Sequence, residues 1–351
     1  MTNGRGLLSV FSLALRSMPQ VKWKLSLSVL PLITSAALSS TSEGAAAART
    51  PSNVIRSSRD YHLLEVVPHD VTSFTQGLTY YNGHIYEGTG MEHESHIFRH
   101  DPTDNMKTQA KISVTPSHLF GEGISHYYVW KDEDGKRVKE HRLIQLTWKD
   151  KVGFIYSLPD MKMIKEFTYE TVTGEGWGIT FIEHTNEFYV SDGSEWLMIW
   201  DAGTLEEKRK VAVTFDRGSE TVKVDLVNEL EFVDFDPSND RPEMQQNCDT
   251  SGGNGRGECP NSARSSFTPA MRILANIWYQ DVIVSIDPLS GKVKRVYNLG
   301  DIYPIHKRHE DRADCLNGIS VTGKAPSDGN GLQIWVTGKL WPNMYRIQLI
   351  N

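Results

Sequence analysis

The sequence has few cysteines and no long apolar segment, and both shortages limit what the protein can be. Three of its 351 residues are cysteine, too few for a small disulfide-stabilised scaffold. Its main apolar stretch, 25–38, contains Pro31 and several serines and is short for a membrane span of ~20 residues. No Gly-x-Ser-x-Gly motif occurs, so a serine nucleophile of that type has no support.

The chain also lacks an excess of positive charge. Its formal net charge is −7, and the basic residues that precede position 50 leave the remainder more acidic still. An acidic body argues against nucleic acid as a partner. A composition of 39% hydrophobic and 23% charged residues suits one large globular domain with a tail.

The N-terminal segment has basic residues but no acid before Glu43. With its apolar stretch and the small residues at 36–40, this pattern predicts a secretory leader over residues 1–40, and therefore a mature protein without a membrane span. An organelle transit peptide is the alternative. Residues 41–58 are rich in Ala and Ser and are expected to form a disordered linker, so the folded domain is predicted over 59–351.

A short phrase, ending in Leu or Ile and leading into a hairpin, starts five times at intervals of about 50 residues once a long insert is set aside. The five starts are Gln76-Gly77-Leu78, Glu122-Gly123-Ile124, Trp177-Gly178-Ile179, Asn228-Glu229-Leu230 and Asn317-Gly318-Ile319. Self-similarity with this period is typical of propellers and solenoids.

Strand-forming runs separated by turn residues dominate from Tyr61 onward. The first repeat predicts strands at 77–81, 84–90, 95–101 and 107–114, and the third predicts four more at 177–183, 187–192, 195–201 and 206–213. Four antiparallel strands per repeat and five repeats predict an all-β, five-bladed β-propeller.

The last repeat supplies three strands, beginning near Gly318, Gln333 and Met344. The run 61–67 has no repeat of its own, so we expect this N-terminal strand to complete the last blade and close the ring. Two polar or Gly-rich inserts, 131–141 and 237–270, are expected to be surface loops. Cys248 and Cys259 lie in the second insert, where a bridge would leave Cys315 single.

In a propeller, the first residues of the innermost strands converge at one mouth of the central channel. These residues are Gln76, Glu122, Trp177, Asn228 and Asn317, joined from neighbouring strands by Glu87, Trp148, Trp278 and Lys339. Apolar walls with a few convergent polar groups favour a small-molecule pocket.

Nine phrases in order resemble the plant and bacterial type of glutaminyl-peptide cyclotransferase. They are SFTQGL at 73–78, FGEG at 120–123, LTWK at 146–149, GEGWG at 174–178, SDGS at 191–194, NELE at 228–231, ANIW at 275–278, LNGI at 316–319 and TGKLWP at 337–342. The resemblance implies a five-bladed propeller that converts N-terminal glutamine to pyroglutamate and releases ammonia, with no catalytic metal and no cofactor.

The resemblance also implies a set of site residues. The essential acid falls on Glu122, and the pocket residues fall on Phe74, Gln76, Phe120, Trp148, Trp177, Asn228, Trp278 and Lys339. The chain departs from the family where Gly88 replaces the usual Ser and where both inserts are long, which affects the expected substrate range.

The reaction itself explains the need for one carboxyl. The α-amine must be neutral to attack the γ-carboxamide, and the leaving nitrogen must depart as ammonia, so one group that accepts and later returns a proton serves both steps. We expect Glu122 to be that group, with the indoles of Trp148, Trp177 and Trp278 raising its pKa by desolvation. Lys339 and Asn228 are expected to stabilise the oxyanion, and Gln76 to orient the substrate.

Structural explanations exist for the same residues. Trp side chains commonly pack between strands, Phe74 and Phe120 could be core, Lys339 could lie on the surface, and Glu229 and Glu231 are more consistent with structural than with catalytic roles. His93, His96 and His100 with Glu92 and Glu94 could suggest zinc ligands, but they fall on a hairpin and an expected exposed strand. His306 and His309 fall in an expected charged loop.

Two other functions compete with cyclisation. A non-catalytic propeller could bind peptides or proteins at the channel mouth, because fold does not fix activity. A metal-dependent lactonase or hydrolase would need several carboxylates at the axis, whereas the predicted lining is mostly Trp and carboxamide. For the cyclotransferase, the expected partners are peptides or proteins with N-terminal Gln, and the enzyme is expected to be a monomer.

Overall fold

The computed structural model describes residues 54–114, 116–234, 271–322 and 331–350. The predicted leader, most of the predicted linker, the insert at 237–270 and its two cysteines lie outside the described residues. No helix within the described ranges has the length and apolar character needed to cross a membrane.

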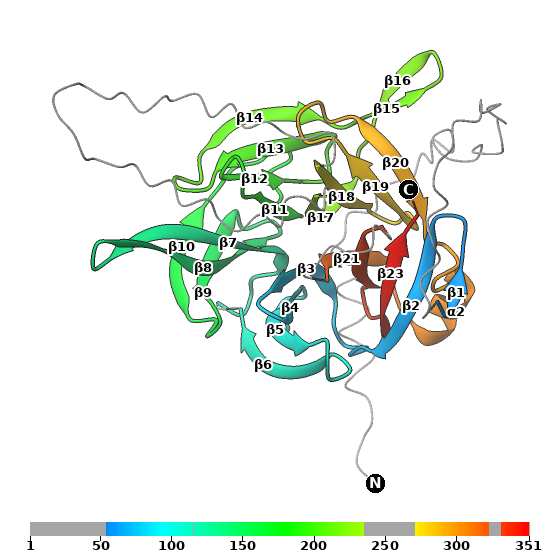
Figure 1. Ribbon diagram of the computed structural model, residues 1–351, viewed down its shortest axis with the longest axis horizontal. Coiled ribbons are helices and arrows are strands. Elements are labelled where there is room, and N and C mark those ends of the chain that lie inside the picture. Colours follow the sequence, from blue (N-terminus) through cyan, green and yellow to red (C-terminus); the bar gives the residue numbers. More distant parts are fainter. Residues whose placement is uncertain (1–53, 115, 235–270, 323–330, 351) are drawn as a thin grey trace, which may run out of the picture. The chain divides into compact units, whose positions relative to one another are not determined.

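The strands form five antiparallel sheets arranged around a common centre (Figure 1). The first three blades are β3 (Thr75–Tyr81), β4 (His84–Thr89), β5 (His96–Asp101) and β6 (Lys107–Ser113); β7 (Gly121–Glu133), β8 (Lys136–Thr147), β9 (Val152–Ser157) and β10 (Met163–Thr168); and β11 (Ile179–Ile182), β12 (Glu187–Val190), β13 (Trp196–Asp201) and β14 (Glu207–Ala212). A separate hairpin, β15 (Thr214–Arg217) and β16 (Glu220–Lys223), precedes the fourth blade.

The last two blades complete the ring. They are β17 (Val227–Asp234), β18 (Met271–Ile277), β19 (Val282–Ile286) and β20 (Val293–Asn298); and β21 (Leu316–Val321), β22 (Gln333–Gly338), β23 (Asn343–Leu349), β2 (Tyr61–Pro68) and β1 (Arg56–Ser57). Each innermost strand contacts the next, in the order β3, β7, β11, β17, β21 and back to β3. The predicted five-bladed propeller is therefore confirmed.

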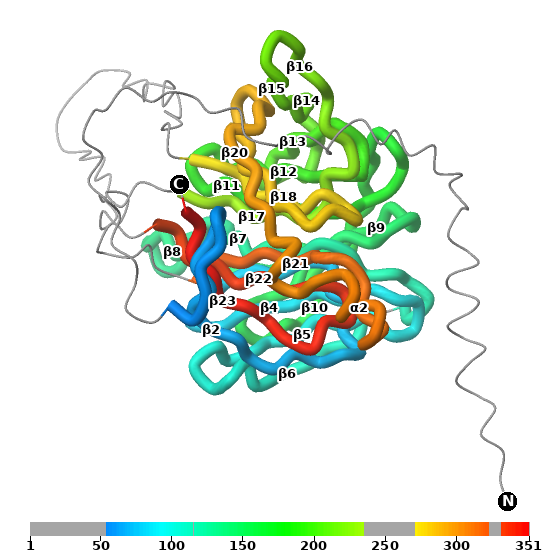
Figure 2. The backbone as a smooth tube through the Cα atoms, turned by 90° about the vertical axis from the view of Figure 1, so that its right-hand side faces the viewer, coloured from blue at the N-terminus to red at the C-terminus, as the bar shows by residue number. Residues whose placement is uncertain are grey.

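The N-terminal strand closes the propeller as predicted. β2 pairs antiparallel with β23 along its whole length, from Tyr61 opposite Leu349 to Pro68 opposite Asn343, and the two strands run side by side in Figure 2. Joining the first and last strands of the fold in one sheet leaves no open gap between the first and last blades, which an unclosed array would have.

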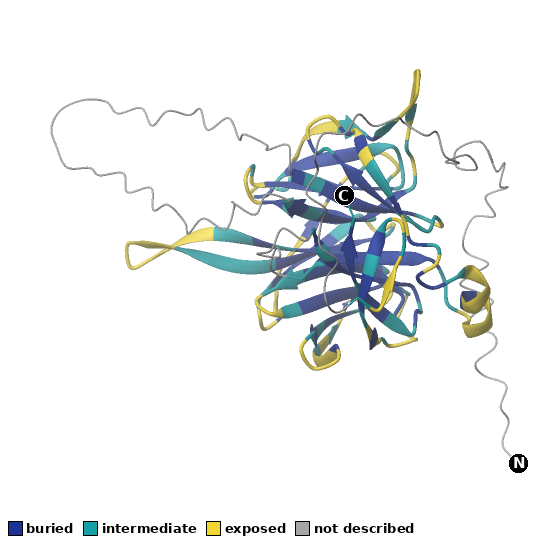
Figure 3. Cartoon of the chain, turned by 45° about the vertical axis from the view of Figure 1, so that its right-hand side comes forward, coloured by how far each residue is buried: buried dark blue, intermediate teal, exposed yellow. Residues whose placement is uncertain are grey.

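Apolar residues from facing sheets fill the space between blades. Tyr127 of β7 packs edge-on against Phe188 of β12, 5.0 Å between ring centroids, and both belong to one buried cluster with Trp200. Figure 3 shows buried residues along the strands and exposed residues at the hairpin ends. The inner strands, such as β3 and β17, are largely buried, whereas the outermost strands β6, β10 and β14 are mostly exposed.

Three segments differ from the sequence-based expectations. Residues 131–141, expected as a loop, extend β7 and β8 into one long hairpin whose far end is exposed. Arg56 and Ser57, placed in the expected linker, pair with β2. The expected charged loop around His306 and His309 is a short helix, α2 (Ile305–Asp311), on which both histidines are exposed.

Candidate active site

A β-bulge places a polar side chain at the start of four of the five innermost strands. The strand register shifts between Thr75 and Gly77, Gly121 and Ile124, Val227 and Leu230, and Leu316 and Ile319. These shifts contain Gln76, Glu122, Asn228 and Asn317. A bulge changes the direction of a side chain from the regular alternation of the strand. The repeated phrase therefore changes the direction of one polar side chain in each of these four strands. The bulges were not predicted.

In the third blade the phrase residue, Trp177, lies before the innermost strand and not in a bulge within it. Trp177 and Gly178 immediately precede β11. A Cβ added at Gly178 would lie 2.1 Å from the carbonyl oxygen of Asn228 in the next blade. Only glycine permits this approach of two backbones, so the small residue in the phrase allows the inner strands to converge.

Glu122 is buried and has a polar partner. It is 6% exposed, and Gln76 donates a hydrogen bond from Nε2 to its Oε1 at 3.3 Å. Burial raises the pKa of Glu122 well above its ordinary value, while the positive charge of Lys339 lowers it and the negative charge of Glu175 adds to the rise. The predicted desolvation of this carboxyl is therefore present.

The carboxamides extend the contacts of Gln76. Asn317 donates from Nδ2 to the Thr75 carbonyl oxygen at 3.0 Å and to Gln76 Oε1 at 3.4 Å, which fixes the amide of Gln76 with its nitrogen toward Glu122. Asn228 is buried, and its Oδ1 has no hydrogen-bond partner among the described residues. Buried polar atoms are normally paired, so this oxygen is available to accept a hydrogen bond from a bound ligand.

Aromatic side chains from successive blades follow one another along the site. Phe74 meets Phe120 edge-on at 6.1 Å between centroids, and Phe120 lies 5.5 Å from Trp148. Trp177 meets Trp278 edge-on at 5.3 Å. All five residues were predicted for the pocket, and the structure brings them into two contacting groups.

Lys339 stands at one end of this aromatic series. Its Nζ lies 4.8 Å from the centroid of the Phe74 ring, a cation–π geometry, and the residue is buried. The turn that carries it is fixed by hydrogen bonds from Lys339 N to the Cys315 carbonyl oxygen and from Leu340 N to the Ser73 carbonyl oxygen. A surface position for Lys339 is therefore wrong.

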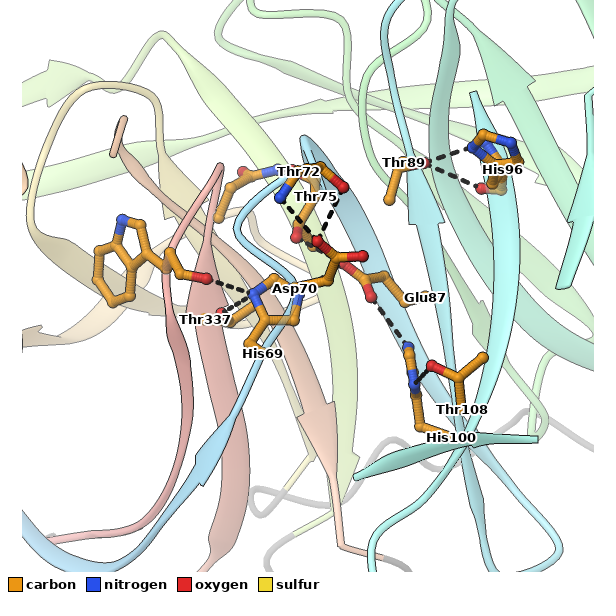
Figure 4. Close-up of polar contacts among 12 residues, drawn as sticks. His69, Asp70, Thr72, Thr75, Glu87, Thr89, His96, His100, Thr108 and Thr337 are labelled. Carbon is orange, nitrogen blue, oxygen red and sulfur yellow. Dashed lines mark hydrogen bonds and ion pairs between the residues drawn. The ribbon is translucent and has the colours of Figure 1, made fainter. Parts of the chain in front are cut away.

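Glu87, expected in the lining, belongs to a separate buried cluster shown in Figure 4. Its carboxylate accepts hydrogen bonds from Thr75 Oγ1 at 2.6 Å and from His69 Nε2 and His100 Nε2, both at 3.0 Å. Although burial opposes it, the charge of His69 and the hydrogen bonds of both histidines hold the pKa of Glu87 below its ordinary value. These partners satisfy both carboxylate oxygens, so Glu87 is structural.

The same cluster corrects the expectation for the histidines. His100 is buried against Glu87 and not on an exposed strand. Within the described ranges, no group of three or more His, Cys, Asp or Glu side chains is arranged to hold a metal ion. His69 also bonds through Nδ1 to the Trp341 carbonyl oxygen at 2.7 Å, which ties the cluster to the turn that carries Lys339.

Two further buried acids lie on β17. Glu229 occupies the position that is glycine in the other four phrases, and its Oε1 accepts a hydrogen bond from Leu78 N in the first blade at 3.3 Å. Glu231 accepts one from Val321 N in the fifth blade at 2.9 Å. Both therefore link inner strands of different blades, which supports the structural role expected for them.

Glu231 should make the stability of the propeller depend on pH. Burial raises its pKa from 4.5 to about 8. Since the folded state then holds a proton that the unfolded state releases above pH 4.5, stability is lost as the pH rises between these values. Glu231→Gln should leave the free energy of unfolding nearly unchanged at pH 5 and raise it at pH 8.5, by on the order of a few kcal/mol.

Urea unfolding of both proteins at the two pH values measures this difference. Glu170→Gln, at an exposed carboxylate paired with Lys151, is the control and should show no pH-dependent gain. Equal differences at pH 5 and pH 8.5 for Glu231→Gln would contradict the assignment.

Comparison with known proteins agrees with this geometry. The glutamine cyclotransferase family model matches residues 32–236 and 268–349. A glutaminyl-peptide cyclotransferase of Arabidopsis thaliana is 27% identical over 292 residues, which cover 82% of this chain and 71% of the plant protein. The crystal structure of Myxococcus xanthus glutaminyl cyclase shares the fold, with a TM-score of 0.55 and 24% identity over 83% of this chain and 97% of the bacterial one. Since the family model spans most of the propeller, this chain belongs to the glutamine cyclotransferase family.

Proposed function

We propose that this protein is a glutaminyl-peptide cyclotransferase, which converts the N-terminal glutamine of peptides and proteins to pyroglutamate and releases ammonia. The observation that carries the proposal is the buried carboxyl of Glu122, which is bonded to Gln76 and influenced by the charge of Lys339. A desolvated carboxyl with a raised pKa can both accept and return a proton near neutral pH.

Glu122 would act first as a base and then as an acid. The α-amine, which has already lost its ammonium proton to solvent, attacks the carbon of the γ-carboxamide, and Glu122 accepts one of the two protons that remain on the attacking nitrogen. A carbon–nitrogen bond forms and the carbonyl electrons move to oxygen. Glu122 then protonates the departing nitrogen, the old carbon–nitrogen bond breaks, and ammonia leaves. A single carboxyl balances both proton transfers, so this route requires no metal ion.

The intermediate carries negative charge on the former amide oxygen. Lys339 is a cation whose charge acts on Glu122, and we assign it to this oxygen, together with the Nδ2 donor of the Asn228 carboxamide. Such preorganised donors stabilise a charge that develops only during reaction. Gln76, oriented by Asn317, would position the amine.

The aromatic residues would form the walls for the glutamine side chain. Phe74, Phe120, Trp148, Trp177 and Trp278 present apolar surface beside the polar groups, as ligand pockets commonly do. Apolar walls also exclude water, which competes with the amine as a nucleophile and would hydrolyse the amide instead. Cyclisation and hydrolysis would release the same ammonia, so the product distinguishes them.

Incubation of the purified protein with a Gln-initiated peptide tests the proposal. We expect ammonia release together with a peptide mass lower by one ammonia, and equal rates with and without a chelator. Absence of release favours the alternative of a non-catalytic, peptide-binding propeller. Chelator-sensitive turnover favours a metal-dependent enzyme.

We also propose that the mature enzyme is a monomer that reaches the secretory pathway, with an organelle as the alternative destination. The acid-free, basic and then apolar composition of residues 1–40 supports a cleaved leader. N-terminal sequencing of the protein recovered from culture medium and from organelles, with light scattering of the purified protein, tests both points. An intact N-terminus in the cytosol, or a stable dimer, would contradict them.

A further inference from the structure

One carboxylate connects the two aromatic groups of the site. Glu175, in the GEGWG segment before β11, accepts hydrogen bonds at the same oxygen, Oε2, from Trp148 Nε1 at 2.8 Å and from Trp177 Nε1 at 2.9 Å. The first indole follows β8 of the second blade and the second precedes β11 of the third. Among the described residues, Glu175 thus joins the group of Phe74, Phe120 and Trp148 to the pair of Trp177 and Trp278.

The backbone around Glu175 is held from both sides. Its carbonyl oxygen accepts a hydrogen bond from Thr171 Oγ1 at 2.7 Å, and Gly176 N donates to the Trp148 carbonyl oxygen at 2.8 Å. Thr173 N donates to Asp192 Oδ2 at 2.8 Å. These bonds fix the backbone that carries Glu175 without using either indole ring, so the carboxylate reaches the two indole N–H groups from a fixed segment of chain.

The Trp177 ring has a second constraint that leaves its N–H facing Glu175. Gly193 has a φ of +80°, and a Cβ at this position would lie 2.6 Å from the ring. Lys149 covers Trp148 in a related way, with its Nζ 3.6 Å from the ring centroid and 3.9 Å from Glu175 Oε1. Each indole is therefore held by contacts on its ring and by Glu175 at its N–H.

Glu175 also has an electrostatic effect on the proton-carrying residue. Its negative charge raises the pKa of Glu122, after burial and against the charge of Lys339. The charge of Glu122 also acts on Tyr169, whose phenol pKa is raised mainly by burial. Lys339 and Glu175 thus act on Glu122 in opposite directions, and Lys149 partly offsets the charge of Glu175.

We propose that Glu175 is a positioning residue of the cyclisation site, which fixes the indoles of Trp148 and Trp177 as pocket walls. The proposal rests on the proposed function. It assigns Glu175 no contact with the reacting atoms. This positioning is separable from the electrostatic effect on Glu122, because the hydrogen bonds need an acceptor oxygen whereas that effect needs the negative charge.

Two substitutions separate these roles. Glu175→Gln keeps an oxygen that can accept from both indoles but removes the charge. It should leave the indole N–H resonances of Trp148 and Trp177 near their original positions and shift the acid limb of kcat/KM to lower pH, because Glu122 then ionises more readily. Glu175→Ala removes both functions, should move both resonances, and should lower kcat/KM about tenfold or more, mainly through KM.

Glu170→Gln is the matched control. It removes the same charge five residues earlier in the chain, from a carboxylate that forms an exposed ion pair with Lys151. It should change neither the resonances nor the pH profile. Unmoved indole resonances in Glu175→Ala would overturn the proposal, and an unchanged acid limb in Glu175→Gln would show that the charge of Glu175 does not act on Glu122.

The resonances and the direct titration of Glu122 by carbon NMR need no turnover. If the unmodified protein released no ammonia, the proposed function would fail while these two measurements still tested Glu175. If turnover were normal but neither measurement responded to substitution, the role of Glu175 alone would be wrong.

Discussion

Glu122→Gln is expected to reduce pyroglutamate formation by at least ~100-fold and to leave the propeller folded. The carboxamide has almost the same shape as the carboxyl and can still accept the hydrogen bond from Gln76, but it cannot take a proton from the substrate amine or return one to the leaving nitrogen. Ammonia release and product mass measure the loss. Circular dichroism and urea unfolding measure the fold.

The matched control is Glu231→Gln. It makes the same chemical change at another buried glutamate of an inner strand, one that bonds to Val321 N and contacts none of the pocket residues through a described hydrogen bond. This variant should retain turnover within about twofold of the unmodified protein. Substantial activity in a folded Glu122→Gln protein, or equal losses in both variants, would remove Glu122 from the central role.

The architecture could be predicted from the sequence because the period was visible despite low similarity between repeats. Five recurring phrases gave the number of blades, and the unpaired run at 61–67 predicted the closing strand that now pairs with β23. These features depend on hydrophobic pattern and counting, which are local properties of the chain.

The direction of individual side chains was less predictable. Gln76 and Glu122 were correctly grouped, but the bulges that present them depend on strand register, which is decided between strands. Glu87 illustrates the consequence. It was expected in the lining because it lies on the strand that follows the first innermost one, whereas in the structure two histidines and Thr75 satisfy it outside the site.

Glu175 was missed for a related reason. In the sequence it is one acidic residue between two glycines, a pattern most often found in solvated turns. Its role comes from Trp148, 27 residues earlier, whose indole reaches it from another blade. The available signal was a combination of two features. Glu175 lies two residues before Trp177, and Trp148 directly follows the second strand of the previous blade.

Lys339→Met should lower kcat about a hundredfold, since the substitution removes the cation assigned to the oxyanion while keeping much of the apolar side chain beside Phe74. Lys111→Met is the control, because it removes a lysine that makes a similar cation–π contact outside the site. The comparison tests whether the loss of kcat comes from the position of Lys339 in the site or from loss of a cation–π contact. Lys111 lies 5.0 Å from the ring centroid of Phe98 on an outer strand, and its loss should leave kcat within about twofold.

The pH profile separates oxyanion stabilisation from a general structural defect. Because the charge of Lys339 lowers the pKa of Glu122, its removal should raise that pKa further and shift the acid limb of kcat/KM to higher pH, opposite to the shift expected for Glu175→Gln. A protein that was merely destabilised would lose activity without either displacement. A hundredfold loss accompanied by an unmoved acid limb would contradict the placement of Lys339 beside Glu122, and opposite shifts in the two variants would identify both charges as acting on one proton.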